Sequence, residues 1–154
     1  MKRLNHPKYL KYLAATMMTL PTLAFASLGG TVSSVQTDQV NMKATMHVAK
    51  KSSTYTVHEI ELTSGTLVHE YVGTDGKVFG VAWNGPTMPN LRQVLGSYFE
   101  TFTKSTNVVK SGHSHMMVSE PNLIVHSEGR LRAFHGNAYI PSMLPVGVTS
   151  SQIL

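Results

Sequence analysis

The sequence contains no cysteine in 154 residues, and charged residues make up only 14% of it. The lack of cysteine excludes disulfide bonds, thiolate chemistry, cysteine-ligated zinc and the acylated cysteine of a lipoprotein. After residue 26, no apolar run approaches the roughly 20 residues that a membrane-spanning helix requires. A chain of this kind must be held together by packing.

The first 26 residues predict a cleavable secretory signal peptide. Basic side chains at positions 2, 3, 8 and 11 precede an uncharged, mostly apolar run from residue 13 to residue 25. Ala24-Phe25-Ala26 then provides the small-x-small pattern that signal peptidase recognises, so we expect cleavage after Ala26. A retained membrane anchor is the alternative, but the run is shorter than a bilayer span and Pro21 interrupts it. We therefore expect a periplasmic or secreted protein without a membrane span.

Removal of this segment changes the charge of the protein. Removing 26 of 154 residues leaves 128, a length typical of a single domain, here residues 27–154. The segment contains four of the 13 basic residues and none of the eight acidic ones. The remaining chain has nine basic and eight acidic residues, so its formal charge is +1 instead of +5. Nucleic-acid phosphates would require a clustered basic face, which the sequence does not show. We expect no nucleic-acid partner.

The segment from Tyr55 to Trp83 predicts three antiparallel strands separated by two glycine turns. The first turn fits a three-residue hairpin loop in which Gly65 takes the left-handed conformation. A two-residue loop would instead place Glu59 against Glu70, and the two carboxylates would repel. The three-residue loop places His58 opposite Glu70 and Glu59 opposite His69.

The second turn, with Gly76, fits the same loop type. In this register three cross-strand pairs share one face of the sheet, and we expect that face to be the core face. The pairs are Tyr71 with Phe79, His69 with Val81 and Leu67 with Trp83.

The residues Met88–Lys104 predict one long helix, because their apolar side chains recur at helical spacing and form a continuous stripe. Asn90 with Gln93 can form a capping box at its start. A second, short helix is predicted for Ser33–Met42. We expect the long helix to lie across the aromatic face of the sheet.

The remaining segments predict three further strands and a tail. The expected strands are Met116–Val118, Leu123–His126 and Leu131–Tyr139, with a turn at Ser127–Gly129; residues 49–53 and 107–114 are expected to be a turn and a loop, and residues 141–154 extended chain. The predicted fold class is therefore α+β: an antiparallel sheet of five or six strands packed on one long amphipathic helix, with a short N-terminal helix.

Several blocks of the mature chain resemble a known family. They are Ala26–Gly30, Tyr55–Ile60, Glu70–Val72, Val78–Pro89, Leu95–Phe99, Arg132–Gly136 and Tyr139–Pro141. These blocks resemble a bacterial family catalogued only as domain of unknown function 2844, and the resemblance covers nearly the whole mature chain. It implies export from a proteobacterium, and it implies no activity, cofactor or catalytic residue.

Histidines are the first candidates for chemistry, since seven of the eight lie after residue 26. His113 and His115 are two residues apart, on the same side of an extended segment, and are a workable pair of metal ligands. Met116 and Met117 follow directly, and histidine with methionine suits copper in an oxidising compartment. His126, His135 or Glu120 can provide a further ligand. The alternative is a pair of solvated loop histidines.

Three other side chains are candidates for ligand binding. Trp83 precedes a rigid Asn-Gly-Pro turn and can stack on a ligand, although the expected register places it in the core. His135 lies beside Gly136, where a ligand can approach the backbone closely. His69, paired with Glu59, can act as an acid or base near neutral pH, or simply form a cross-strand ion pair.

No catalytic motif is present: the sequence has no Gly-x-Ser-x-Gly elbow, no phosphate-binding glycine loop and no His-Glu-x-x-His helix. It therefore predicts an exported, non-enzymatic binding or envelope-assembly protein that needs no cofactor, with another exported or envelope protein as its partner. The alternative is a periplasmic copper- or zinc-binding protein that uses His113 and His115.

Overall fold

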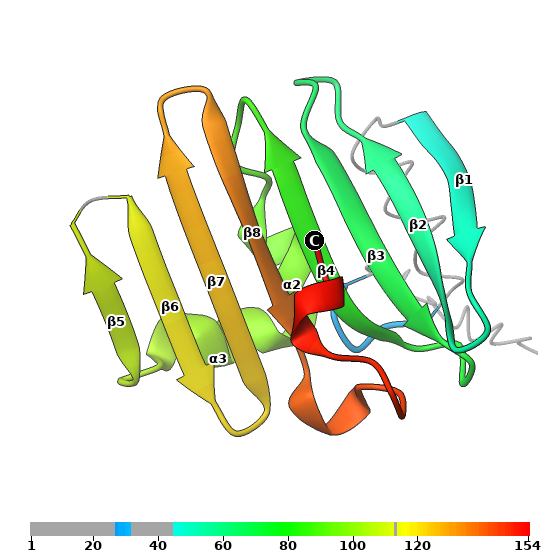
Figure 1. Ribbon diagram of the computed structural model, residues 1–154. Helices are drawn as coiled ribbons and strands as arrows, with labels where there is room; N and C mark the ends of the chain where they lie inside the picture. The colour runs from blue at the N-terminus through cyan, green and yellow to red at the C-terminus, as the bar shows by residue number, and fades with distance from the viewer. Residues whose placement is uncertain (1–26, 32–44, 113) are drawn as a thin grey trace, which may run out of the picture.

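The computed structural model describes residues 27–31, 45–112 and 114–154 of the chain (Figure 1). Its main element is one eight-stranded antiparallel sheet with the order β1-β2-β3-β4-β8-β7-β6-β5. The strands are β1 (Thr45–Lys51), β2 (Tyr55–Glu61), β3 (Leu67–Gly73), β4 (Val78–Gly85), β5 (Val108–Ser111), β6 (His115–Glu120), β7 (Leu123–Arg130) and β8 (Ala133–Tyr139). Two four-stranded meanders are thus joined at their last strands, β4 and β8. The predicted signal segment and the predicted helix Ser33–Met42 lie outside the described residues.

The prediction of five or six strands is wrong, because the described sheet has eight. The two strands that the sequence did not predict, β1 and β5, lie at the edges of the sheet. β1 extends to Lys51, into the expected turn, and β5 lies within the expected loop. An edge strand has one neighbouring strand and commonly carries charged or polar side chains. The polar ends of the two strands, Lys50-Lys51 in β1 and Lys110-Ser111 in β5, were therefore interpreted as part of a turn and of a loop.

The prediction of a single long helix is also wrong. The segment forms α2 (Leu91–Leu95), the 3-10 turn η1 (Gly96–Tyr98) and α3 (Phe99–Lys104). Gly96 has a φ of 52°, which interrupts a right-handed helix. The apolar stripe packs on the sheet, but on the face opposite Tyr71 and Phe79, so the prediction that the helix covers the aromatic face is wrong. Asn90 caps α2 as its side-chain oxygen accepts a hydrogen bond from the Arg92 N–H at 3.1 Å, in place of the predicted capping box with Gln93.

The register of β2 with β3 is confirmed, with His58 opposite Glu70 and Glu59 opposite His69. The three-residue loop inferred from the charges therefore places both histidines correctly.

The predicted register of β3 with β4 holds next to the turn but is wrong by one residue beyond Phe79. Phe79 is an extra residue of β4 and forms a β-bulge. The flanking pairs are Tyr71 with Gly80 and Val72 with Val78. The one-residue shift reverses the faces of β4 beyond the bulge, so Trp83 lies opposite Val68 and not opposite Leu67.

The sheet is covered on both faces, by different parts of the chain (Figure 1). We call the face under α2, η1 and α3 the helix face. We call the opposite face the tail face, because residues 140–154, with the 3-10 turns η2 (Pro141–Met143) and η3 (Ser150–Gln152), cross it in front of β4 in Figure 1. The larger core includes Val68, Val81, Trp83, Leu95 and Val125 on the helix face. A smaller core of Tyr71, Phe79, Ala82, Val148 and Ile153 lies on the tail face.

The turn between β7 and β8 lies at Leu131–Arg132, not at the predicted Ser127–Gly129. Gly129 is a strand residue opposite Phe134, and a Cβ atom on it would lie 2.4 Å from the Phe134 ring. This glycine therefore marks close packing within the hairpin rather than a turn.

Candidate binding site on the tail face

The segment Ile153–Leu154 is fixed to the tail face by both polar and apolar contacts. The Leu154 N–H donates to the Tyr71 hydroxyl at 2.9 Å, and that hydroxyl donates to the Leu154 carbonyl oxygen at 2.7 Å. The Asn137 amide nitrogen donates to the Ile153 carbonyl oxygen at 2.9 Å. The Ile153 side chain is fully buried over Gly80, where a Cβ atom would lie 3.0 Å from its Cδ1. The tail is therefore an integral part of this face.

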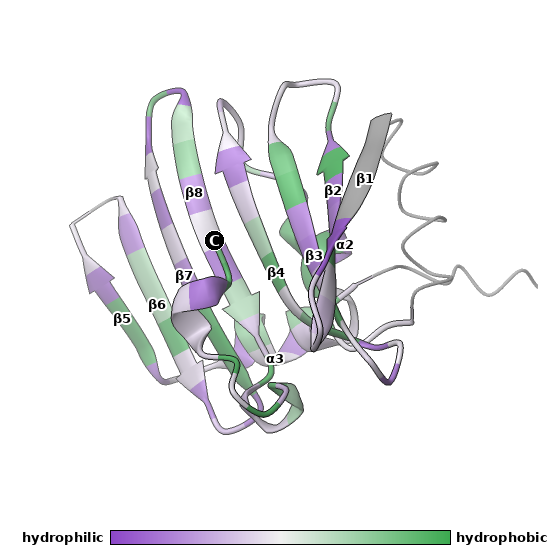
Figure 2. Cartoon of the chain, turned by 45° about the vertical axis from the view of Figure 1, so that its right-hand side comes forward, coloured by the Kyte–Doolittle hydropathy of each residue, from purple (hydrophilic) through white to green (hydrophobic). Residues whose placement is uncertain are grey.

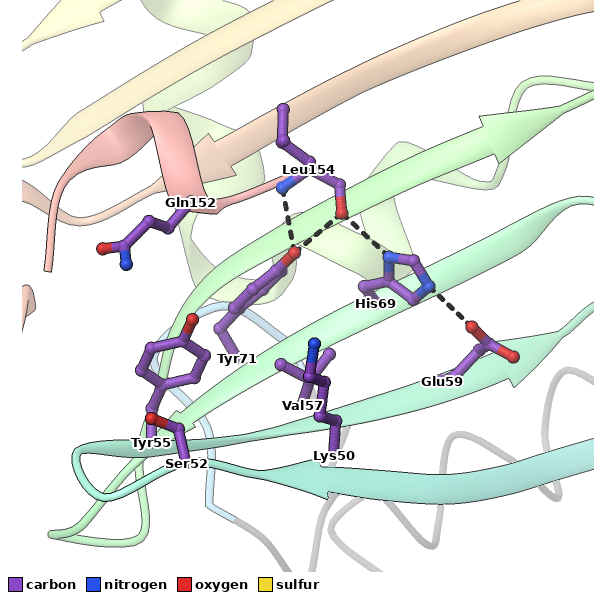
Figure 3. A pocket seen from close by; sticks show the side chains of 9 residues that line it. All are labelled: Lys50, Ser52, Tyr55, Val57, Glu59, His69, Tyr71, Gln152 and Leu154. Carbon is purple, nitrogen blue, oxygen red and sulfur yellow. Dashed lines mark hydrogen bonds and ion pairs between the residues drawn. The ribbon is translucent and has the colours of Figure 1, made fainter.

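His69 extends this contact to β2. Its Nδ1 lies 2.9 Å from the Leu154 carbonyl oxygen, and its Nε2 lies 2.8 Å from Glu59 Oε2 (Figure 3). Both partners are hydrogen-bond acceptors when Glu59 is ionised, so the ring satisfies both contacts when both of its nitrogens carry a proton.

Tyr71 is almost completely buried, with 4% of its surface exposed. Burial raises the pKa of its hydroxyl above the ordinary value of 10.0, and the hydrogen bond to Leu154 acts in the opposite direction. The neutral phenol can donate one hydrogen bond and accept another, which is what the Leu154 backbone requires.

A pocket of about 300 Å³ lies beside these residues (Figure 3). It is lined by Lys50, Ser52, Tyr55, Val57, Glu59, His69, Tyr71, Gln152 and Leu154. The Tyr55 and Tyr71 rings are 5.9 Å apart, and Phe79 meets the Tyr55 ring edge-on at the same distance. Three aromatic rings therefore support one apolar wall.

The polar groups of the pocket are of two kinds. Glu59 and His69 are paired with each other. Within the described part of the chain, the Lys50 ammonium group and the Tyr55 hydroxyl have no hydrogen-bond or ion-pair partner. The pocket thus combines an aromatic wall with polar groups that a ligand can engage.

A family model described as protein of unknown function (DUF2844) matches residues 24–153, which is most of the chain. The chain belongs to the DUF2844 family. A search of the curated proteins finds no match, and a search of the solved structures finds none either. The description of the DUF2844 family assigns no activity, so the chemistry of the site has to be inferred from its geometry.

The ligand-binding candidates lie apart in this DUF2844 chain. His69 lines the pocket. Trp83 is only 2% exposed and lies on the helix face, so it does not reach the pocket. His135 is on the tail face but on β8, where its Nε2 contacts Glu128 Oε2 at 3.0 Å.

The metal-ligand candidates only partly come together. His115 Nδ1 contacts Glu128 Oε1 at 3.0 Å, so Glu128 lies between His115 and His135. The hydrogen bond from His135 lowers the pKa of the Glu128 carboxyl group, and the bond from His115 adds to this effect. His126 is in the next row of the same face, opposite Met117.

No three histidine, aspartate or glutamate side chains in the described ranges could hold a metal ion. His113 lies outside those ranges. A copper or zinc site that uses His113, His115 and His126 therefore stays a prediction, to be tested by metal titration of the protein.

Sequence reasoning missed Tyr55, Tyr71 and Leu154 as site residues. Tyr55 and Tyr71 come together through the register of β2 with β3, which was predicted, but nothing in the sequence showed that the tail would cross this face. Glu128 was expected in a turn and instead faces two histidines. Among the described helices, none is long and apolar enough to cross a membrane.

Proposed function

We propose that this protein is an exported, non-enzymatic binding protein whose ligand site is the pocket between β2, β3 and the tail. The observation that supports this proposal is the aromatic wall of Tyr55 and Tyr71 beside polar groups that have no partner in the described part of the chain. Such a combination is typical of small-molecule sites, where apolar walls provide affinity and a few polar groups fix orientation.

The charges of the pocket define the kind of ligand. Glu59 already contacts His69, whereas Lys50 is the lining cation without a partner in the described part. An ammonium group at the rim of an aromatic pocket favours an anionic group on an apolar body. The ligand class is therefore a small amphipathic anion, such as an aromatic carboxylate.

A ligand-observed NMR screen of aromatic carboxylates, each paired with its neutral amide, tests this proposal. We expect carboxylates to bind the protein more tightly than their amides, and Lys50→Gln to remove most of that difference. Lys77→Gln is the matched control, because Lys77 is exposed in the turn between β3 and β4, away from the pocket lining. Equal binding of acids and amides, or equal effects of the two lysine variants, would contradict the anionic ligand.

Export is supported by the basic segment, the apolar run and the small-x-small pattern of residues 1–26. Expression of the whole chain in a bacterium should yield a protein whose intact mass corresponds to a chain starting at Ser27, recovered from outside the cytoplasm. A full-length chain found only in the cytoplasmic fraction would contradict export.

A further inference from the structure

The turn between β7 and β8 exposes an apolar side chain on a strained backbone. Leu131 is 94% exposed. Its neighbour Arg132 has a φ of 62°, and among the described residues no other residue apart from glycines has a positive φ. Two-residue hairpin turns favour Asn-Gly or similar pairs, which tolerate positive φ and are polar. The pair Leu-Arg is thus unfavourable for both solvation and backbone conformation.

The turn is also rich in positive charge. Arg130 and Arg132 flank Leu131, and both are exposed. Glu128 is the only acidic residue from Leu123 to Tyr139, and its two oxygens are already engaged by His115 and His135. In Figure 2 this turn, at the upper end of the sheet, is green between purple stretches. The exposed Leu131 side chain is therefore flanked by two exposed cations, of which Arg130 lies near the Glu128 carboxylate.

We propose that the Arg130–Leu131–Arg132 turn docks the protein on an anionic membrane surface, with Leu131 entering the boundary between headgroups and acyl chains. The arginines would bind headgroup phosphates, for which their guanidinium groups are well suited. A polar pair with glycine at the second position would be better solvated and less strained in this turn. Binding to a partner outside the chain is a physical reason for keeping an exposed leucine and a strained arginine there. This role is independent of the pocket, which lies on the other half of the sheet.

A lipid surface fits this turn better than a folded protein partner does. A stable protein interface buries about 800 Å² on each partner, far more than one two-residue turn offers. A lipid surface needs no complementary shape, and a short apolar wedge with flanking cations is enough for weak, reversible binding. An acidic protein partner is thus the less favoured occupant, and the test separates the two.

Sedimentation of the purified protein with vesicles tests the proposal. We expect binding to vesicles of phosphatidylglycerol and little binding to vesicles of phosphatidylcholine. The double variant Leu131→Asn with Arg132→Gly removes the apolar side chain and places glycine at the position with positive φ, so it should melt at a higher temperature while its partition onto phosphatidylglycerol falls about tenfold or more. Arg130→Gln alone should reduce partition about fivefold, the effect of roughly 1 kcal/mol for one cation near an anionic surface.

Val146→Asn is the matched control, because Val146 is 97% exposed but lies in the tail. It should leave partition unchanged. Three outcomes would overturn the proposal: no binding to phosphatidylglycerol vesicles, equal binding to both lipids, or unchanged partition of the single variant Leu131→Asn. Unchanged partition of Leu131→Asn would show that the protein is attracted by charge without insertion of the leucine. No binding to phosphatidylglycerol vesicles would favour an acidic protein partner. Circular dichroism and the melting temperature show whether each variant is folded.

Discussion

Single glycine positions determine how side chains pack on both faces of the sheet. A Cβ atom on Gly136 would lie 2.4 Å from Trp83 Cζ2 and 2.4 Å from the His126 carbonyl oxygen. The indole of Trp83 therefore covers a backbone without a side chain, which lets the largest side chain of the core lie flat against β8. Gly80 has the corresponding role on the tail face, where it accommodates Ile153.

These two glycines give a matched pair of substitutions. We expect Gly136→Ala to lower the free energy of unfolding by about 2–3 kcal/mol, since the new methyl group meets a backbone oxygen and a rigid ring. Gly80→Ala should change it by less than about 1 kcal/mol, because Ile153 can move by a few tenths of an ångström and alanine reduces the entropy of the unfolded chain. Urea unfolding measures both values. Equal losses would show that Trp83 is packed less tightly than the structure indicates.

The Tyr71 hydroxyl makes the stability of the protein depend on pH in the alkaline range. Because burial raises its pKa above 10.0, the unfolded chain loses this proton first, so the contribution is complete below about pH 10 and is lost as the pH rises further. Tyr71→Phe leaves the Leu154 N–H without its partner, removes one of the two contacts of the Leu154 carbonyl oxygen, and should cost about 1–2 kcal/mol at pH 8.

The same variant should lose less stability than the wild type between about pH 9 and pH 11, because phenylalanine does not ionise. Urea unfolding across this range measures the difference in slope. Parallel pH profiles for the two proteins would show that Tyr71 does not retain its proton through burial.

At the scale of elements, the sequence predicted those strands whose pattern is set by burial. β2 and β3 were found with the correct register, because the charges of Glu59 and Glu70 disfavour the alternative. β5 was missed because an exposed edge strand of four residues has no apolar alternation: Val109 is 62% exposed, and Lys110 and Ser111 are exposed as well.

Two other elements were predicted wrongly because tertiary contacts outweigh local patterns. The bulge at Phe79 inserts one residue without changing the apolar character of β4, so the sequence contains no sign of the shift. The stripe from Leu91 to Phe102 is helical in spacing, but Gly96 adopts a positive φ next to Ser27, where a Cβ atom would overlap the Ser27 side chain. The candidate site depends on such contacts, which explains why only His69 was identified in advance.

At the scale of the whole molecule, the tail links stability to the proposed site. Its residues Val148 and Ile153 complete the smaller core over Tyr71, Phe79 and Ala82. The tail also provides Gln152 and Leu154 as pocket walls. A change that releases the tail should therefore expose apolar surface and open the pocket at the same time.

Ile153→Ala tests this link with little disturbance to the rest of the chain. Ile153 is fully buried, so the substitution should lower the free energy of unfolding by about 2–4 kcal/mol. The control is Val146→Ala, at a position in the same tail that is 97% exposed. It should change the free energy of unfolding by less than about 0.5 kcal/mol. Urea unfolding, followed by the fluorescence of the single tryptophan Trp83 on the helix face, reports the stability of the opposite side of the sheet. If Ile153→Ala lowers stability no more than Val146→Ala does, the tail is not part of the cooperative fold. If it lowers stability as expected and also weakens carboxylate binding at a pH and temperature where the variant is folded, the tail both stabilises the sheet and shapes the pocket.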